Sequence, residues 1–435
     1  PTVLLRSTYG RGVGHESMIE DFNKRGYALV VQDVRGMGDS EGEPYVFHAD
    51  GWRPDKQDGA DTVDWIREQA WSNDVIGGFG GSALAITQNM LAPATPHVDA
   101  QYMELVASDF YHDAAYPGGV WQKNMLEGWT AGIQQPHVAN NWKAHPRDDD
   151  YWQWYDMVAQ AGNIETPGLF VGGWYDIFGQ GTIDGFVSRQ ERGGEGARGK
   201  NMLIMKWGGH GADKSETQFT DDFAADPNRY DLRISEVAAA WFDYHLHGKE
   251  DALDAYSTVH YYTIGDADDP EAPGNVWRTA DTWPPFDTTG TPIFFGPDGL
   301  LSGEAPGEAG TASFTFDPAD PFPTLGGPLL LMPFGPYDQR AVSEGREDYL
   351  AFVSEPLEQP LEITGRVRVR LFVSTDAPDT DFTAKLLDIY PDGREINMLD
   401  NIQRVKFRNG FEEAAPLLDD PEEIVEVTVD LWSTS

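Results

Sequence analysis

Short apolar runs alternate with helical patterns through the first half of the chain, and this alternation constrains the fold more than any other feature. The runs lack the polar positions of a half-exposed strand, which is typical of a parallel sheet covered on both faces. They are predicted as strands at 3–6, 27–34, 75–79, 98–107, 168–172 and 202–207, with helices at 18–24, 59–70, 82–91 and 234–246. The sequence therefore predicts an α/β fold with right-handed crossovers.

Two changes in pattern divide the chain. Residues 109–164 are rich in tryptophan and show no strand alternation, so we predict a helical cap inserted between two parts of the α/β core, 1–108 and 165–250. Beyond residue 250 the composition shifts to Pro, Gly and Asp, with period-two strands and turn signals. Residues 251–435 are therefore predicted to form an all-β domain, a jelly-roll sandwich.

The charge excludes one class of partner. The chain carries 72 acidic residues against 31 lysines and arginines, a formal net charge of -41. A polyanion would be repelled, so nucleic-acid binding is not expected. The acids are spread in short clusters along the chain, which favours a halophilic protein over an ordinary acidic enzyme, because molar salt screens their repulsion.

Other bulk features set weaker limits. There is no cysteine, and the ten histidines show no ligand spacing, so we predict no metal site and no cofactor. No apolar run of about 18 residues is present, so no membrane span is expected. Both chain ends resemble interior positions of a longer protein, which leaves localisation open, with the cytoplasm slightly favoured. The sequence also allows a homo-oligomer.

The strongest local signal is the segment 80–85, Gly-Gly-Ser-Ala-Leu-Ala, between a predicted strand and a predicted helix. A sharp turn in this context lifts a serine hydroxyl above the sheet edge, as in a nucleophile elbow. The departure is Leu84, where the commonest elbow has a second glycine. A glycine-rich turn before any helix could look similar, so the fragment alone does not decide the function of Ser82.

Two further residues complete a serine triad. Asp176 follows the predicted strand 168–172, and His210 follows the predicted strand 202–207. The order Ser, Asp, His is that of α/β hydrolases, and the carboxyl ends of parallel strands meet at one sheet edge. We therefore predict Ser82 as nucleophile, His210 as base and Asp176 as its orienting carboxylate. The alternatives are a loop histidine and a helix N-cap.

Acyl transfer also needs donors for the oxyanion. The backbone N–H of Ala83 follows from the elbow geometry. The loop after the first strand contains Tyr9, whose hydroxyl could be a second donor or whose ring could simply pack. Four tryptophans are predicted to line the acyl pocket, with core packing as the alternative for each: Trp121, Trp129, Trp174 and Trp207.

Several motifs occur in an order that resembles the cocaine-esterase/NonD family, which groups with X-Pro dipeptidyl-peptidases, α-amino-acid ester hydrolases and glutaryl-cephalosporin acylases. They span most of the chain: Arg-Ser-Thr-Tyr-Gly at 6–10, Gln-Asp-Val-Arg-Gly at 32–36, Trp-Ser-Asn at 71–73, Gly-Gly-Ser at 80–82, Gly-Gly-Trp-Tyr-Asp at 172–176, Trp-Gly-Gly-His-Gly at 207–211, and segments at 317–321, 335–340 and 377–382.

The resemblance implies an α/β-hydrolase core, a helical cap and a jelly-roll domain that together form the pocket. It also implies that Tyr9 is the second oxyanion donor. Family members often carry Tyr and Gly where this chain has Ala83 and Ala85, so acyl preference stays open. Relative to the family, the chain is expected to lack the opening strands and the end of the jelly-roll.

The sequence thus predicts a serine hydrolase that cleaves carboxylic esters or acyl amides of small molecules or short peptides through an acyl-serine. An X-Pro dipeptidyl-peptidase is the second candidate. A non-catalytic protein that binds a polymer or glycan on a hydrolase scaffold is the alternative from another class.

Overall fold

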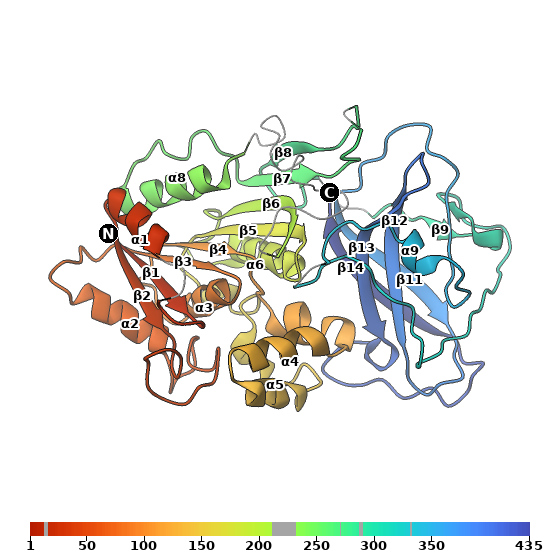
Figure 1. Ribbon diagram of the computed structural model, residues 1–435, viewed down its shortest axis with the longest axis horizontal. Coiled ribbons are helices and arrows are strands. Elements are labelled where there is room, and N and C mark those ends of the chain that lie inside the picture. The colour runs from red at the N-terminus through yellow and green to blue at the C-terminus, as the bar shows by residue number, and fades with distance from the viewer. Residues whose placement is uncertain (13–15, 211–231, 270, 287–289, 331–332) are drawn as a thin grey trace.

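The computed structural model describes the chain except residues 13–15, 211–231, 270, 287–289 and 331–332. An α/β core and a β-rich C-terminal domain lie side by side, and the cap helices lie below the junction between them (Figure 1). The three parts meet near the carboxyl ends of the central strands, where the predicted site residues are.

Eight strands of the described chain form one large sheet in the order β2-β1-β3-β4-β5-β6-β7-β8. All neighbouring pairs are parallel except β7 with β8. The apolar runs predicted as strands form its centre, which confirms the α/β class. The bounds are β1 Thr2–Ser7, β2 Ala28–Asp33, β3 Ile76–Gly81, β4 Ala100–Glu104, β5 Gly168–Tyr175, β6 Met202–Gly209, β7 Val259–Thr263 and β8 Val276–Ala280.

Helices cover both faces of this sheet, which explains why its strands are apolar on both sides. Helices α1 (Glu16–Lys24) and α8 (Ile234–His247) pack on one face, around Phe242 and Leu246. Helices α2 (Asp58–Arg67), α3 (Ala83–Leu91) and α6 (Gly179–Arg192) cover the other. The sequence did not predict α6, because its glycines and polar residues hide the helical period.

The large sheet continues into residues 251–435, the segment that we predict as the C-terminal domain. Strand β7 pairs with β6, and β8 closes the sheet edge. These short strands near prolines and glycines are indistinguishable by pattern from sandwich strands. Their pairing with the large sheet is a long-range contact, which periodicity does not reveal.

The predicted cap segment is helical and aromatic. It contains α4 (Lys123–Gly132), α5 (Pro136–Lys143), a π-helical turn (Tyr111–Ala115) and 3₁₀ turns at Pro117–Gly119, Trp152–Tyr155 and Ala161–Asn163. Trp142 and Trp152 are almost completely buried. Aromatic side chains thus supply much of the apolar packing of this segment.

The C-terminal domain is an antiparallel β-sandwich. Strand β11 (Gly365–Val373) pairs with β14 (Val425–Thr434), and β12 (Asp381–Ile389) pairs with β13 (Glu395–Arg404). Apolar residues from both pairs face each other around Leu399, Val429 and Leu431. A small hairpin, β9 (Phe294–Phe295) with β10 (Leu301–Ser302), and helix α9 (Arg340–Ser343) lie at its periphery. The jelly-roll connectivity stays a prediction.

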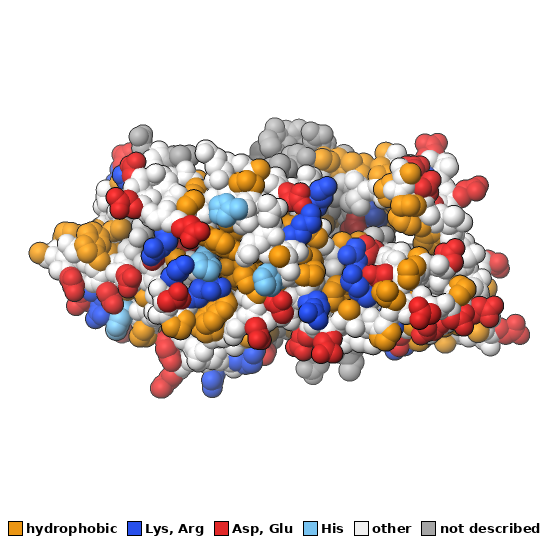
Figure 2. All heavy atoms as spheres, turned by 90° about the horizontal axis from the view of Figure 1, so that it is seen from below, with side chains coloured by type: hydrophobic (Ala, Val, Ile, Leu, Met, Phe, Trp, Pro, Cys, Tyr) orange, Lys and Arg blue, Asp and Glu red, His pale blue; other side chains and the backbone are white. Residues whose placement is uncertain are grey.

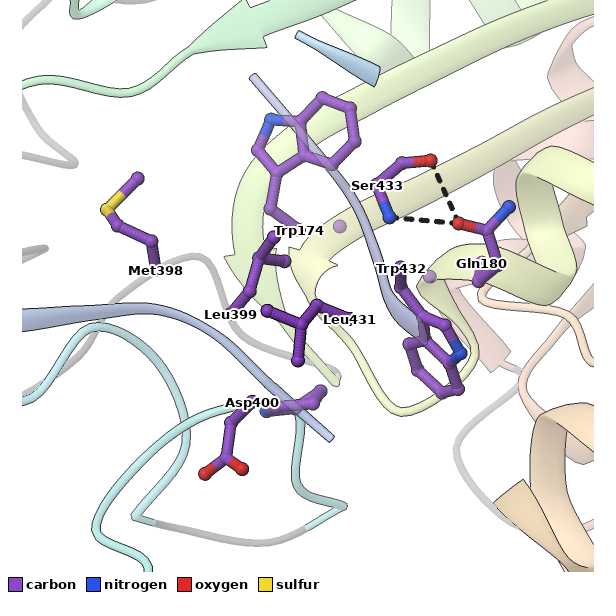
Figure 3. A pocket seen from close by; sticks show the side chains of 11 residues that line it. Trp174, Gln180, Met398, Leu399, Asp400, Leu431, Trp432 and Ser433 are labelled. Atoms are coloured by element: carbon purple, nitrogen blue, oxygen red, sulfur yellow. Dashed lines mark hydrogen bonds between the residues drawn. The ribbon is translucent and has the colours of Figure 1, made fainter. Parts of the chain in front are cut away.

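The sandwich docks against the end of β5 and the start of α6. Figure 3 shows Ser433 of β14 bonded twice to the Gln180 side chain, through its backbone N–H and its hydroxyl, both at 2.9 Å. Trp174, Met398 and Leu399 line a small cavity beside this contact. Trp174 is one of the predicted pocket residues, but the residues that line this cavity include neither Ser82 nor His210, so it does not open onto the predicted nucleophile or base.

A group of acids, one buried and two partly buried, lies where the cap, α6 and the sandwich meet. Asp113 is 4% exposed and accepts the N–H groups of Ser108 and Asp109, both at 2.8 Å. Burial raises the pKa of Asp113 well above its ordinary value, and the charges of Asp109 and Asp184 act in the same direction. Burial also raises the pKa of Asp109 to about 7, against the opposing charge of His112.

Because of these acids, we expect the free energy of unfolding to fall as the pH rises. Their native pKa values exceed the ordinary value of 3.8, so the native state binds more protons than the unfolded state. The stability associated with the neutral carboxyls is present below about pH 4 and is lost toward pH 7. Asp113→Asn keeps the accepting oxygen and removes the titration, so its melting temperature is expected to fall less between pH 5 and pH 8. Equal pH slopes in thermal melts of variant and parent would contradict this.

Carboxylates are spread over the face seen from below, and lysines and arginines lie mainly near its middle (Figure 2). The acidic excess therefore does not form one binding patch on this face. Halophily stays a prediction.

Candidate active site

Ser82 lies at a strained turn between β3 and α3. Its backbone has φ 56° and ψ -127°, a region that non-glycine residues rarely adopt. The turn requires Gly80, because a Cβ there would lie 2.3 Å from the carbonyl oxygen of Leu84. The Ser82 N–H donates to the Glu104 carbonyl at the end of β4, at 2.8 Å. The turn is therefore fixed against the sheet edge and raises the Ser82 side chain above it.

The structure brings the three predicted triad side chains into one chain of contacts. Ser82 Oγ lies 2.8 Å from His210 Nε2, and His210 Nδ1 lies 2.5 Å from Asp176 Oδ2. Asp176 is completely buried, and its other oxygen accepts the Phe178 N–H at 2.8 Å. With its proton on Nδ1, His210 presents the Nε2 lone pair to the serine hydroxyl.

Close pairing of β5 with β6 sets the distance between Asp176 and His210. Each residue comes directly after its strand, and the strands remain paired through Tyr175 and Gly209. Gly173 permits the approach, since a Cβ there would lie 2.3 Å from the Gly208 carbonyl oxygen. The two side chains therefore meet because neighbouring strands end at the same level.

Both predicted oxyanion donors belong to neighbouring segments. Ala83 is the first residue of α3, so its N–H has no carbonyl partner within the helix. Tyr9 follows β1, which pairs in parallel with β3, so the two loops leave the sheet at the same edge. Partial burial raises the pKa of Tyr9, whereas a hydrogen bond from Trp129 lowers it. The phenol thus stays protonated at neutral pH and can donate.

The four tryptophans predicted to line the pocket differ in their surroundings. Trp207 is 1% exposed and packs on Tyr262, with ring centroids 4.6 Å apart. Trp174 is 5% exposed and donates to the Tyr262 carbonyl at 2.7 Å. Core packing accounts for these contacts, and a pocket role for either residue stays a prediction.

The two cap tryptophans are only partly buried. Trp121 donates to Glu127 Oε1 at 3.1 Å within the cap. Trp129 reaches across to the core and donates to the Tyr9 hydroxyl at 3.0 Å. Trp129 therefore contacts another predicted site residue directly.

Two residues near the site were not found from the sequence. Phe178 covers the edge of the His210 ring at a centroid distance of 5.6 Å and a plane angle of 84°. Phe334, from the C-terminal domain, packs so close to Gly209 that a Cβ on this glycine would lie 2.3 Å from the Phe334 ring. Both are phenylalanines in loops, and no local pattern distinguishes them from ordinary core residues.

Among the described residues, no group of three or more histidines and acids could hold a metal ion. No helix in the described ranges is both long and apolar enough to cross a membrane.

Comparisons with known proteins place this chain in a family. Residues 1–139 and 130–212 match the model of X-Pro dipeptidyl-peptidase (S15 family), and residues 251–435 match its C-terminal non-catalytic domain. A cocaine esterase of Rhodococcus sp. (strain MB1 Bresler) is 32% identical over 505 residues, which covers 100% of this chain and 83% of the relative.

Solved structures support the same fold. An α-amino-acid ester hydrolase superimposes with a TM-score of 0.80 at 24% identity, covering 100% of this chain and 82% of that one. A CocE/NonD family hydrolase from Staphylococcus aureus gives a TM-score of 0.72 at 20% identity, covering 100% and 78%. The chain therefore belongs to the family of serine hydrolases that includes cocaine esterase and the X-Pro dipeptidyl-peptidases.

Proposed function

We propose that this protein hydrolyses carboxylic esters of small molecules through a covalent acyl-serine on Ser82. The observation that carries the proposal is the contact chain from Ser82 Oγ through His210 to the buried Asp176, at 2.8 and 2.5 Å. A serine hydroxyl is a weak nucleophile until an adjacent base accepts its proton, and this arrangement supplies the base.

The proposed reaction has two halves. His210 Nε2 accepts the Ser82 proton as Oγ attacks the acyl carbon, and the oxyanion accepts hydrogen bonds from the Ala83 N–H and the Tyr9 hydroxyl. His210 then donates the proton to the leaving alcohol. Water repeats the sequence, with His210 as base, and releases the acid and free Ser82.

Asp176 supports both halves in this proposal. Its carboxylate holds the Nδ1 proton of His210 and stabilises the imidazolium that forms in each half. Because Phe178 fixes its second oxygen, the carboxylate cannot rotate freely.

An X-Pro dipeptidyl-peptidase is the second candidate, favoured by the S15 family match. Similarity over the whole chain to a relative named cocaine esterase favours the ester reaction. A peptidase would also need carboxylates that hold the substrate's α-ammonium group, and no described contact assigns such a pair.

The experiment compares p-nitrophenyl esters of short acids with Ala-Pro-p-nitroanilide, at low and molar salt, for the parent and Ser82→Ala. We expect ester turnover to exceed anilide turnover at every salt concentration and to be lost in Ser82→Ala. Preferred turnover of the anilide would replace the esterase by the peptidase. Folded protein inactive on both substrates would favour the non-catalytic binding protein.

A further inference from the structure

One side chain of the cap reaches the Tyr9 hydroxyl. The indole N–H of Trp129, on α4, donates to this oxygen at 3.0 Å across 120 positions of sequence. A phenolic hydroxyl has one proton to donate and lone pairs that accept. Occupation of a lone pair by Trp129 leaves the Tyr9 proton to point toward another acceptor.

The Trp129 ring is held in a stack of three aromatic rings from separate segments. Phe47 lies nearly parallel to Trp129, with a centroid distance of 5.7 Å and an angle of 13°. Phe47 also stacks with Trp142 of α5, with a ring-centroid distance of 6.4 Å and an interplanar angle of 15°. Phe47 and Trp142 are 1% and 0% exposed. The stack therefore links loop 44–52 with both cap helices.

The backbone at Phe47 supports a fixed arrangement. Its φ is 66°, in the left-handed region that bulky residues avoid. Such a conformation persists only where the surrounding packing determines it, and it is concentrated at functional sites. The Val46 N–H also donates to Gln135 Oε1, at the start of α5, at 2.8 Å. Loop and cap are thus joined by this hydrogen bond as well as by the ring stack.

We propose that Trp129 is a positioning residue for Tyr9, which directs the phenolic proton toward the oxyanion formed at Ser82. The inference rests on the proposed function, in which Tyr9 is an oxyanion donor. It differs from a pocket-lining role, because a residue that lines the pocket changes acyl preference. A residue that orients the donor changes the rate for every acyl group alike.

The test is Trp129→Phe, which keeps an aromatic ring for the stack and removes the N–H donor. We expect kcat to fall about 2- to 12-fold, the range of one typical hydrogen bond, for acetyl, butyryl and hexanoyl p-nitrophenyl esters alike. The values of KM and the order of preference are expected to stay unchanged. Tyr9→Phe should lower kcat by about 10²-fold or more. The double variant should be no slower than Tyr9→Phe alone, because the two act as one unit.

The matched control is Trp152→Phe, which removes another cap indole N–H, bonded to the His145 carbonyl at 3.0 Å. Its kcat is expected to stay within about twofold of the parent, because a packing change away from the reacting groups alters the stability of the protein and not the rate of the reaction. Phe47→Leu tests the same link without altering Trp129, and it should lower kcat with KM unchanged.

Four outcomes separate the explanations. Unchanged kcat in folded Trp129→Phe or Phe47→Leu, with a large loss in Tyr9→Phe, would overturn the positioning role. A changed acyl preference with unchanged kcat would overturn it in favour of pocket lining. Unchanged kcat in Tyr9→Phe would instead remove the oxyanion assignment, and activity in Ser82→Ala would remove the proposed function itself.

Discussion

Asp176→Asn is expected to lower kcat for a p-nitrophenyl ester by about 10⁴-fold, as the same change does in another serine triad. The Phe178 N–H selects the amide oxygen of the asparagine as its acceptor. The NH₂ group would then face His210 Nδ1, which must act as acceptor. The histidine proton moves to Nε2, and this nitrogen can no longer take the Ser82 proton.

The control for this loss is Asp113→Asn, which alters a buried carboxylate outside the proposed triad. We expect it to retain kcat within a few fold. Measured kcat and thermal melts of both variants separate a lost base from a lost fold. An Asp176→Asn enzyme with kcat within tenfold of the parent would contradict the role assigned to Asp176.

Gly80→Ala is expected to destabilise the protein by about 1–3 kcal/mol and to abolish most activity. The added Cβ would lie 2.3 Å from the Leu84 carbonyl oxygen and 2.7 Å from the Ala85 nitrogen. Both are backbone atoms of the first turn of α3, so relief requires movement of the turn that carries Ser82. A shift of about 1 Å in a reacting group can cost 10²-fold in rate.

The neighbouring glycine provides a matched control. A Cβ on Gly81 would meet only the Glu104 carbonyl oxygen, at 3.9 Å, which is ordinary contact. Gly81→Ala is therefore expected to melt within a few degrees of the parent. Equal stability and activity of the two alanine variants would contradict the close approach at Gly80.

The sequence predicted those parts of the molecule that depend on local pattern. Continuous apolar runs identified the central strands of the sheet, because only strands covered on both faces lack polar alternation. Ser82, Asp176 and His210 were proposed as partners because each follows such a strand, and parallel strands end at one edge. The contacts among them in the structure agree with that argument.

Features that depend on long-range contact could not be predicted. The pairing of β7 with β6, and of β8 with β7, leaves no local signal in the sequence. The Trp129 bond to Tyr9 joins positions 120 residues apart, and Phe47 carries no mark of its left-handed backbone. Trp207 is buried and Trp129 only partly buried, and nothing in the local sequence distinguishes these two tryptophans.

The most direct test of the central claim is the site of covalent labelling by a fluorophosphonate, followed by peptide mass spectrometry. The probe captures a serine only where a base activates it, and the adduct does not hydrolyse during the measurement. We predict one phosphonate per chain on the peptide that contains Ser82, with no labelling of Ser82→Ala. Labelling of another residue, or ester hydrolysis by Ser82→Ala at the parent rate, would contradict the account.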